Sequence, residues 1–182
     1  MTRDASTAQE RAARGHGMLK VISGGQTGVD RAALDAAIEL GMPYGGWCPR
    51  GGWAEDLAEP PGLRARYPEL RETPSADPLQ RTEWNVRDSH RLMILVDRRG
   101  LAVSNGCKAA GNFALALGRP SAVIALDAPE ALASARAFLA EGRGPVCIAG
   151  PREGEAPGIY AKARPLLCAV FAGLDRRSLN RI

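Results

Sequence analysis

A chain of 182 residues, 45% of them hydrophobic and 24% charged, is long enough for one domain with a sizeable core. The net charge of +4 is mild, and no basic run or basic–aromatic stripe occurs, so nucleic-acid binding is not expected. No apolar stretch approaches membrane-spanning length, and the first residues lack the apolar core of a secretory signal. Asp4 and Glu10 argue against a mitochondrial presequence. We therefore expect a cytoplasmic protein without membrane association.

The chain divides into three expected parts. Residues 1–17 are polar and lack periodicity, which predicts a flexible N-terminal tail. Residues 18–175 carry the alternating apolar segments of a single ligand-binding domain, and residues 176–182 form a short C-terminal tail.

The first third of the domain begins with an apolar strand at residues 18–22 and a helix at 29–38. Gly41 and Pro43 then predict a helix stop, and a short strand is expected at 44–48. Residues 49–78 are rich in Gly, Pro, Arg and Glu. Such a long segment without clear structure predicts a functional loop or a lid.

Strands and helices continue to alternate through the rest of the chain. The expected elements are a helix at 80–89, a strand at 91–96, a loop at 97–106, a helix to 117, a strand at 122–126, a helix at 129–139, a strand at 146–149 and a helix at 159–171. This order predicts an α/β fold, a Rossmann-like doubly wound sheet of about five mainly parallel strands with helices on both faces.

The glycine-rich turn at residues 23–28 connects the first strand directly to the first helix. In this arrangement, free N–H groups and the dipole of the first helical turn favour a bound anion. The spacing matches neither the dinucleotide fingerprint nor the P-loop. The alternative is a tight strand-to-helix turn without a ligand. If the loop amides hold an anion, replacing Gly25 by Asp should abolish binding and leave the fold largely intact.

Two further glycine-containing loops follow strands, at residues 104–108 and 149–153. Ligands of parallel sheets bind beyond the carboxyl ends of the strands, so all three loops should meet at one rim and hold an elongated anion. For Ser104 and Asn105, capping of the following helix is an equally good interpretation.

Several polar and nucleophilic side chains are candidates for ligand contact or chemistry. Arg81, Asn85, Asp88 and Ser89 share one face of a helix, which favours ligand contact over a plain solvated face. Cys107 at a helix start beside Lys108 should have a lowered thiol pKa. The spacing of the four cysteines is wrong for structural zinc, and Cys147 and Cys168 are expected to be core thiols. With only two histidines, His16 and His90, a histidine-based triad is not expected.

Six segments together carry a family resemblance: Ile22–Asp35, Gly45–Pro49, Ala54–Asp56, Leu70–Thr73, Arg81–Ser89 and Ala149–Glu153. They resemble the molybdenum cofactor carrier family, within the Rossmann-like group that includes the lonely-guy phosphoribohydrolases. The resemblance runs from about Leu19 to Leu174. The chain departs from the family pattern at Cys107 in the second loop and at His90 before the central strand.

The resemblance implies a non-catalytic carrier of the molybdenum cofactor, a phosphorylated molybdopterin, or of a related anionic ligand. It also implies a homo-oligomer, a dimer or tetramer, with molybdoenzymes or cofactor-synthesis proteins as partners. The alternatives are a nucleoside monophosphate phosphoribohydrolase-like enzyme and a nucleotide-type ligand sensor. The catalytic glutamate of the lonely-guy motif has no counterpart after residues 104–108, which counts against the enzyme.

No catalytic residue and no metal ligand are assigned. The expected cofactor-binding residues come from the three loops and the polar helix: Gly24, Gly25, Gln26, Thr27, Gly28, Asp30, Arg31, Arg81, Asn85, Asp88, Ser89, Ser104, Asn105, Gly106, Cys107, Lys108, Gly150, Arg152 and Glu153.

Overall fold

The computed structural model describes residues 19–179, and side chains as far as Leu174; the expected tail at 1–17 lies outside the described residues. In chain order the elements are β1 (Lys20–Ile22), α2 (Val29–Glu39), β2 (Tyr44–Cys48), α3 (Leu63–Arg66), β3 (Leu70–Glu72), α4 (Pro78–Arg87), β4 (Arg91–Val96), the 3₁₀ turn η1 (Gly100–Val103), α5 (Asn105–Ala116), β5 (Ser121–Ala125), α6 (Ala131–Ala140), β6 (Pro145–Ala149) and α7 (Ile159–Leu179). Within residues 19–179, no helix has the length and apolar character needed to cross a membrane.

The strands form one parallel sheet of six strands in the order β3-β2-β1-β6-β4-β5. The expected Rossmann-like α/β class is confirmed. The expected number of about five strands is corrected to six, because β3 at one edge of the sheet was not anticipated.

The segment at residues 49–78 is a packed part of the domain, which corrects the expectation of a long irregular loop. It contains α3 and β3, and β3 pairs with β2 through Leu70 opposite Gly46. Leu63, Tyr67 and Leu70 are buried in one apolar cluster with Leu34 of α2. This burial fixes the segment against the first helix, as hydrophobic contact does elsewhere in protein cores.

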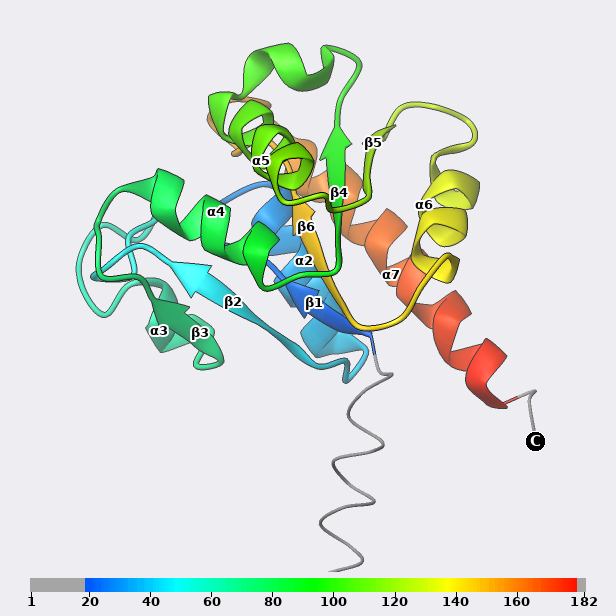
Figure 1. The fold of residues 1–182 in the computed structure, drawn as a ribbon, viewed down its shortest axis with the longest axis horizontal. Coiled ribbons are helices and arrows are strands. Elements are labelled where there is room, and N and C mark those ends of the chain that lie inside the picture. Colours follow the sequence, from blue (N-terminus) through cyan, green and yellow to red (C-terminus); the bar gives the residue numbers. More distant parts are fainter. Residues whose placement is uncertain (1–18, 180–182) are drawn as a thin grey trace, which may run out of the picture.

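Helices cover both faces of the sheet. Figure 1 shows α4 and α5 in front of the sheet, and α2 and α7 behind it. The two cores follow the alternation of β4, whose residues are all buried: Met93 and Leu95 belong to the core with α2, α6 and α7, whereas Leu92 and Ile94 belong to the core with α4 and α5.

The order of the strands reverses in the middle of the sheet. The chain proceeds outward from β1 to β2 and β3, crosses to β4 and β5 on the other side, and returns through β6 between β1 and β4. The loops that follow β1, β6 and β4 therefore leave neighbouring strands at the same edge, where parallel sheets form their binding crevice.

Candidate ligand cavity

A cavity of about 280 Å³ lies at the carboxyl edge of β1, β6 and β4. All three strand-following loops contribute to it, together with the first turns of α4 and α5. Its lining consists of Gln26, Asp30, Trp53, Pro78, Leu79, Arg81, Thr82, Ser104, Asn105, Gly106, Cys107, Ala110, Ala149, Gly150, Arg152 and Glu155. The expected meeting of the three loops at one rim is thus what the structure shows.

A buried ion pair between Asp30 and Arg81 lines this cavity. Arg81 Nη1 donates to Asp30 Oδ2 at 2.9 Å, and the two side chains are 16% and 5% exposed. Gly24 makes room for the pair, since a Cβ there would lie 2.0 Å from Arg81 Nη1. Burial raises the pKa of Asp30 although Arg81 opposes the rise. The cavity wall therefore contains a paired acidic and basic group, and the pKa of Asp30 depends on its contact with Arg81.

The second loop supplies the start of α5. Ser104 is the N-cap, and its Oγ accepts from the N–H of Cys107 at 3.3 Å. This is the capping role that the sequence left open for Ser104. Asn105 and Gly106 are exposed and line the cavity. Because the first N–H groups of a helix have no partner within it, the amides of these two lining residues are candidate donors for an anion.

Arg152 and Glu155 lie at the cavity edge on the loop after β6. Arg152 Nη2 donates to Glu155 Oε1 at 3.3 Å, and Arg152 Nη1 lies 3.9 Å from Glu55 Oε2. Glu55 also accepts from the hydroxyl of Thr27 and from the N–H of Gly154. These contacts join the first loop, the segment around residue 55 and the third loop at the rim.

Two amides at the end of the first loop and the start of α2 are engaged within the protein. Thr27 N donates to the side chain of Gln26 at 3.1 Å, and Val29 N donates to Pro151 O at 3.3 Å. Of residues 24–28, only Gln26 lines the cavity. The geometry thus favours the start of α5 over the first loop as the anion contact.

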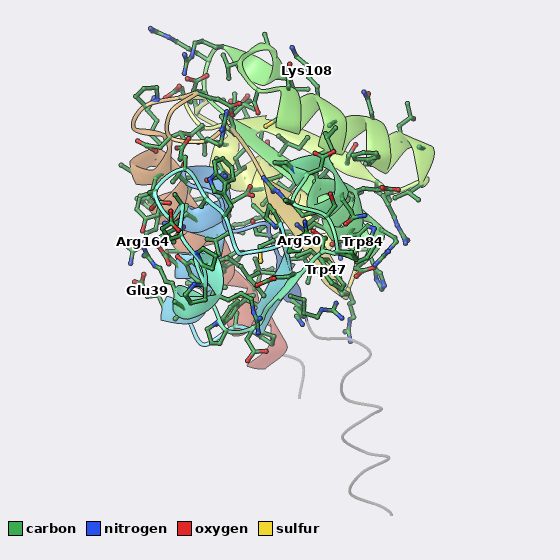
Figure 2. All side chains as sticks on the ribbon, turned by 90° about the vertical axis from the view of Figure 1, so that its left-hand side faces the viewer. Glu39, Trp47, Arg50, Trp84, Lys108 and Arg164 are labelled. Carbon is green, nitrogen blue, oxygen red and sulfur yellow. The ribbon has the colours of Figure 1, made fainter. Side chains whose placement is uncertain are left out.

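Three expected ligand residues of α4 and its end are engaged within the protein: Asn85 and Asp88 hold α4 onto β2, and Ser89 bonds back to the end of α4. Asn85 accepts from the N–H of Trp47 at 2.7 Å and donates to its carbonyl oxygen at 3.0 Å. Asp88 accepts from Trp47 Nε1 at 2.7 Å, and Ser89 Oγ donates to Asn85 O at 2.7 Å. Figure 2 shows Trp47 and Trp84 beside each other, with their ring centroids 4.7 Å apart. None of the three residues lines the cavity.

Three further expected residues, Arg31, Glu153 and Lys108, also lie outside the cavity lining. Arg31 forms a two-pronged ion pair with Asp56, both contacts being 2.9 Å, and Glu153 accepts from the N–H groups of Gly158 and Tyr160 at the start of α7. Lys108 is exposed on α5, far from Trp47 and Trp84 in Figure 2. The nine expected residues that do line the cavity are Gln26, Asp30, Arg81, Ser104, Asn105, Gly106, Cys107, Gly150 and Arg152.

The expectation of a lowered thiol pKa for Cys107 is wrong. Burial under β4 and α4 raises the pKa of Cys107 to about 12, against the smaller effect of the Ser104 hydrogen bond. Helix position alone could not reveal this, since the sequence did not show which face of α5 packs on the sheet. Cys107 is therefore a buried thiol at the cavity wall.

Native thiol labelling should reflect this burial. At pH 8, we expect iodoacetamide to modify Cys168 first, because it is partly exposed, whereas Cys48, Cys107 and Cys147 are buried. Mass spectrometry of the intact protein and of its tryptic peptides measures the order. Rapid modification of Cys107 in the folded protein would contradict the burial described above.

Sequence reasoning missed Trp53, Pro78, Leu79, Thr82, Ala110, Ala149 and Glu155, which complete the lining. Trp53 and Glu155 lie in segments without helical or strand periodicity, so the sequence did not indicate whether their side chains point into the domain or to solvent. Among residues 19–174, no group of three or more His, Cys, Asp and Glu side chains is arranged to hold a metal ion.

A parallel sheet with helices on both faces and a cavity at the carboxyl ends of its central strands defines a Rossmann-like α/β protein. Residues 21–171 match the model of the circularly permutated YpsA SLOG family, cpYpsA. The chain belongs to this family.

One solved structure is similar along most of the chain. It is the crystal structure described as "Putative molybdenum carrier protein" from Syntrophus aciditrophicus SB, with 36% sequence identity and a TM-score of 0.73. The similarity covers 85% of this chain and 95% of that one. No curated protein matches the chain.

Proposed function

We propose that the protein binds the molybdenum cofactor, or a closely related phosphorylated ligand, in this cavity and releases it unchanged. The observation that carries the proposal is the mixed character of the lining. Arg81, Arg152 and the first amides of α5 suit an anion, whereas Asp30 and Glu155 suit a ligand with N–H donors. A phosphorylated pterin offers both kinds of group. The similar molybdenum carrier structure supports the same choice.

Arg81 is the strongest anion donor of the lining. A guanidinium has five N–H donors, and within the described residues Arg81 gives one of them, to Asp30. The side chain is 16% exposed, so its other donors can reach a ligand in the cavity. A charge-assisted, two-pronged contact to a phosphate is the interaction for which arginine is best suited.

The size of the cavity is close to that of small-molecule sites. Such sites have volumes of about 300–1,000 Å³, and this cavity, at about 280 Å³, lies just below that range and is open to solvent at its mouth. In the proposed complex, the phosphate contacts Arg81, Arg152 and the amides of Asn105 and Gly106. The pterin edge contacts the carboxylate of Asp30.

Carriage without turnover is favoured by the state of the carboxylates in the cavity. Asp30 is paired with Arg81, and Glu155 is paired with Arg152. Among the described residues, no histidine lines the cavity. A positioned general acid or base contributes typically about 10²–10⁴-fold in rate, and neither pair presents a free one. Hydrolysis of nucleoside monophosphates is the second candidate, because Glu155 and Glu55 flank Arg152 at the rim.

Incubation with released molybdenum cofactor and, separately, with nucleoside monophosphates tests the proposal. We expect the protein to slow the oxidative decay of the cofactor and to release no free base. Rapid release of base at micromolar substrate would instead support the hydrolase, and an unchanged rate of cofactor decay would remove the carrier function.

A matched pair of variants tests whether protection of the cofactor depends on the cavity. A Cβ at Gly106 would meet only Ser104 Oγ, at 3.6 Å, and one at Gly111 of the same helix would meet nothing within 4 Å. Gly106→Asp adds a negative charge beside the proposed phosphate contact, whereas Gly111→Asp adds it one and a half turns away. We expect only Gly106→Asp to lose protection of the cofactor, with the fold kept in both variants.

A further inference from the structure

Two large apolar side chains are exposed although they line the cavity. Trp53 is 36% exposed and Leu79 is 51% exposed. Exposed apolar surface that lines a cavity is typical of a ligand contact. Neither side chain is needed to complete an apolar core cluster of the described residues.

The backbone under Trp53 is anchored on both sides. Gly52 is buried, donates to Pro49 O at 2.9 Å and accepts from Leu63 N at 2.7 Å. Ala54 is fully buried and exchanges two hydrogen bonds with Leu57, at 3.0 and 3.1 Å. The next residue, Glu55, donates its N–H to Gln26 Oε1 of the first loop at 2.9 Å. The indole is therefore exposed on a fixed backbone.

Leu79 is fixed in the same way on the first turn of α4. Asp77 caps this helix, and its Oδ1 accepts from Leu79 N at 2.9 Å. Trp53 and Leu79 thus both contribute to the apolar wall of the cavity from an anchored backbone, and the other lining includes Arg81, Asn105 and Gly106. A side chain on an anchored backbone binds a flat ring with less loss of conformational freedom than one on a mobile loop.

We infer that Trp53 is a specificity-determining residue that stacks on a planar heteroaromatic ring of the ligand, with Leu79 extending the same apolar wall. The cavity then selects ligands that combine such a ring with a phosphate over ligands that carry the phosphate alone. This inference rests on the proposed function, since it concerns the same cavity and the same ligand class.

Affinity for two probes that share a phosphate tests the selection. GMP carries a planar ring, and ribose 5-phosphate does not. By calorimetry, the wild-type protein should bind GMP more tightly, and Trp53→Ala should weaken GMP binding by about tenfold or more while leaving ribose 5-phosphate unchanged. Trp53→Phe should restore most of the GMP affinity, because a phenyl ring also stacks.

Tryptophan fluorescence supplies a second readout, which would not respond to GMP if Trp53 had only a structural role. GMP should quench the tryptophan emission of the wild type, whereas Trp53→Phe should keep the affinity and lose the quenching. Leu115→Ala is the matched control, because Leu115 is 82% exposed and does not line the cavity. It should behave as the wild type in both assays.

The two possible failures are distinguishable. If the wild type bound neither probe and did not protect released molybdenum cofactor, the proposed function would fail and the inference with it. If the wild type bound the probes or the cofactor, and Trp53→Ala bound each as tightly, the inference alone would be overturned.

Discussion

Arg81→Ala is expected to reduce the free energy of unfolding by about 3–5 kcal/mol at neutral pH, because it leaves the buried Asp30 carboxylate without its partner. Urea denaturation monitored by circular dichroism measures the loss. The same variant should lose affinity for phosphorylated ligands, because Arg81 lines the cavity.

The pH dependence of this loss has a definite sign. Burial already raises the pKa of Asp30 above its ordinary value of 3.8, and Arg81 is the main group that opposes the rise. Removing Arg81 therefore raises this pKa further. A carboxyl group with a raised pKa in the folded state favours folding below its unfolded pKa, and this contribution is lost as the pH rises through the folded pKa. The difference in stability between Arg81→Ala and the wild type should thus be small near pH 4 and grow toward pH 7.

Two controls separate the buried charge from other effects. Arg98 is exposed, and its side chain makes no hydrogen bond within the described residues, so Arg98→Ala should stay within about 0.5 kcal/mol of the wild type. The double variant Asp30→Asn, Arg81→Gln removes both charges and should be more stable than Arg81→Ala alone. If Arg81→Ala were as stable as Arg98→Ala at pH 7, the ion pair would not hold Asp30 ionised in the folded protein.

The sequence predicted the features that depend on local pattern. The buried strand at 91–96 and the strand at 44–48 were placed with the bounds that the structure gives to β4 and β2. The meeting of the three loops followed from the alternation of strands and helices, because parallel strands bring their carboxyl ends to one edge. β3, by contrast, has three residues in a segment rich in Gly and Pro, which is too short to show a period.

Other features depend on contacts between distant segments. Asp30 and Arg81 are 51 residues apart, and nothing in either motif indicates that they pair. Arg81 and Asn85 share a helix face as predicted. One end of that face lines the cavity and the other packs on β2. Of these two residues, only Arg81 can therefore reach a ligand. The pKa of Cys107 rises for the same reason, since burial by other elements decides it.

Gly25→Asp is expected to destabilise the fold strongly, which corrects the sequence-based expectation that this variant would lose only ligand binding. Gly25 has φ +71°, and a Cβ there would meet Leu70 at 3.0 Å, Leu63 at 3.2 Å and Leu34 at 3.4 Å. These three leucines belong to the buried cluster that fixes α3 and β3 against α2. An uncompensated carboxylate among them should cost about 3–5 kcal/mol, measured by urea denaturation.

Gly41→Asp is the matched control, because Gly41 has φ +64° and a Cβ there would meet nothing within 4 Å. It imposes the same left-handed strain without burial and should cost about 1 kcal/mol. Gly25→Asn keeps the shape of the new side chain and removes its charge, so its stability should lie between those of the two Asp variants. If Gly25→Asp were as stable as Gly41→Asp and lost only the ligand, the amides of residues 24–28 would be the anion site after all, and the start of α5 would not.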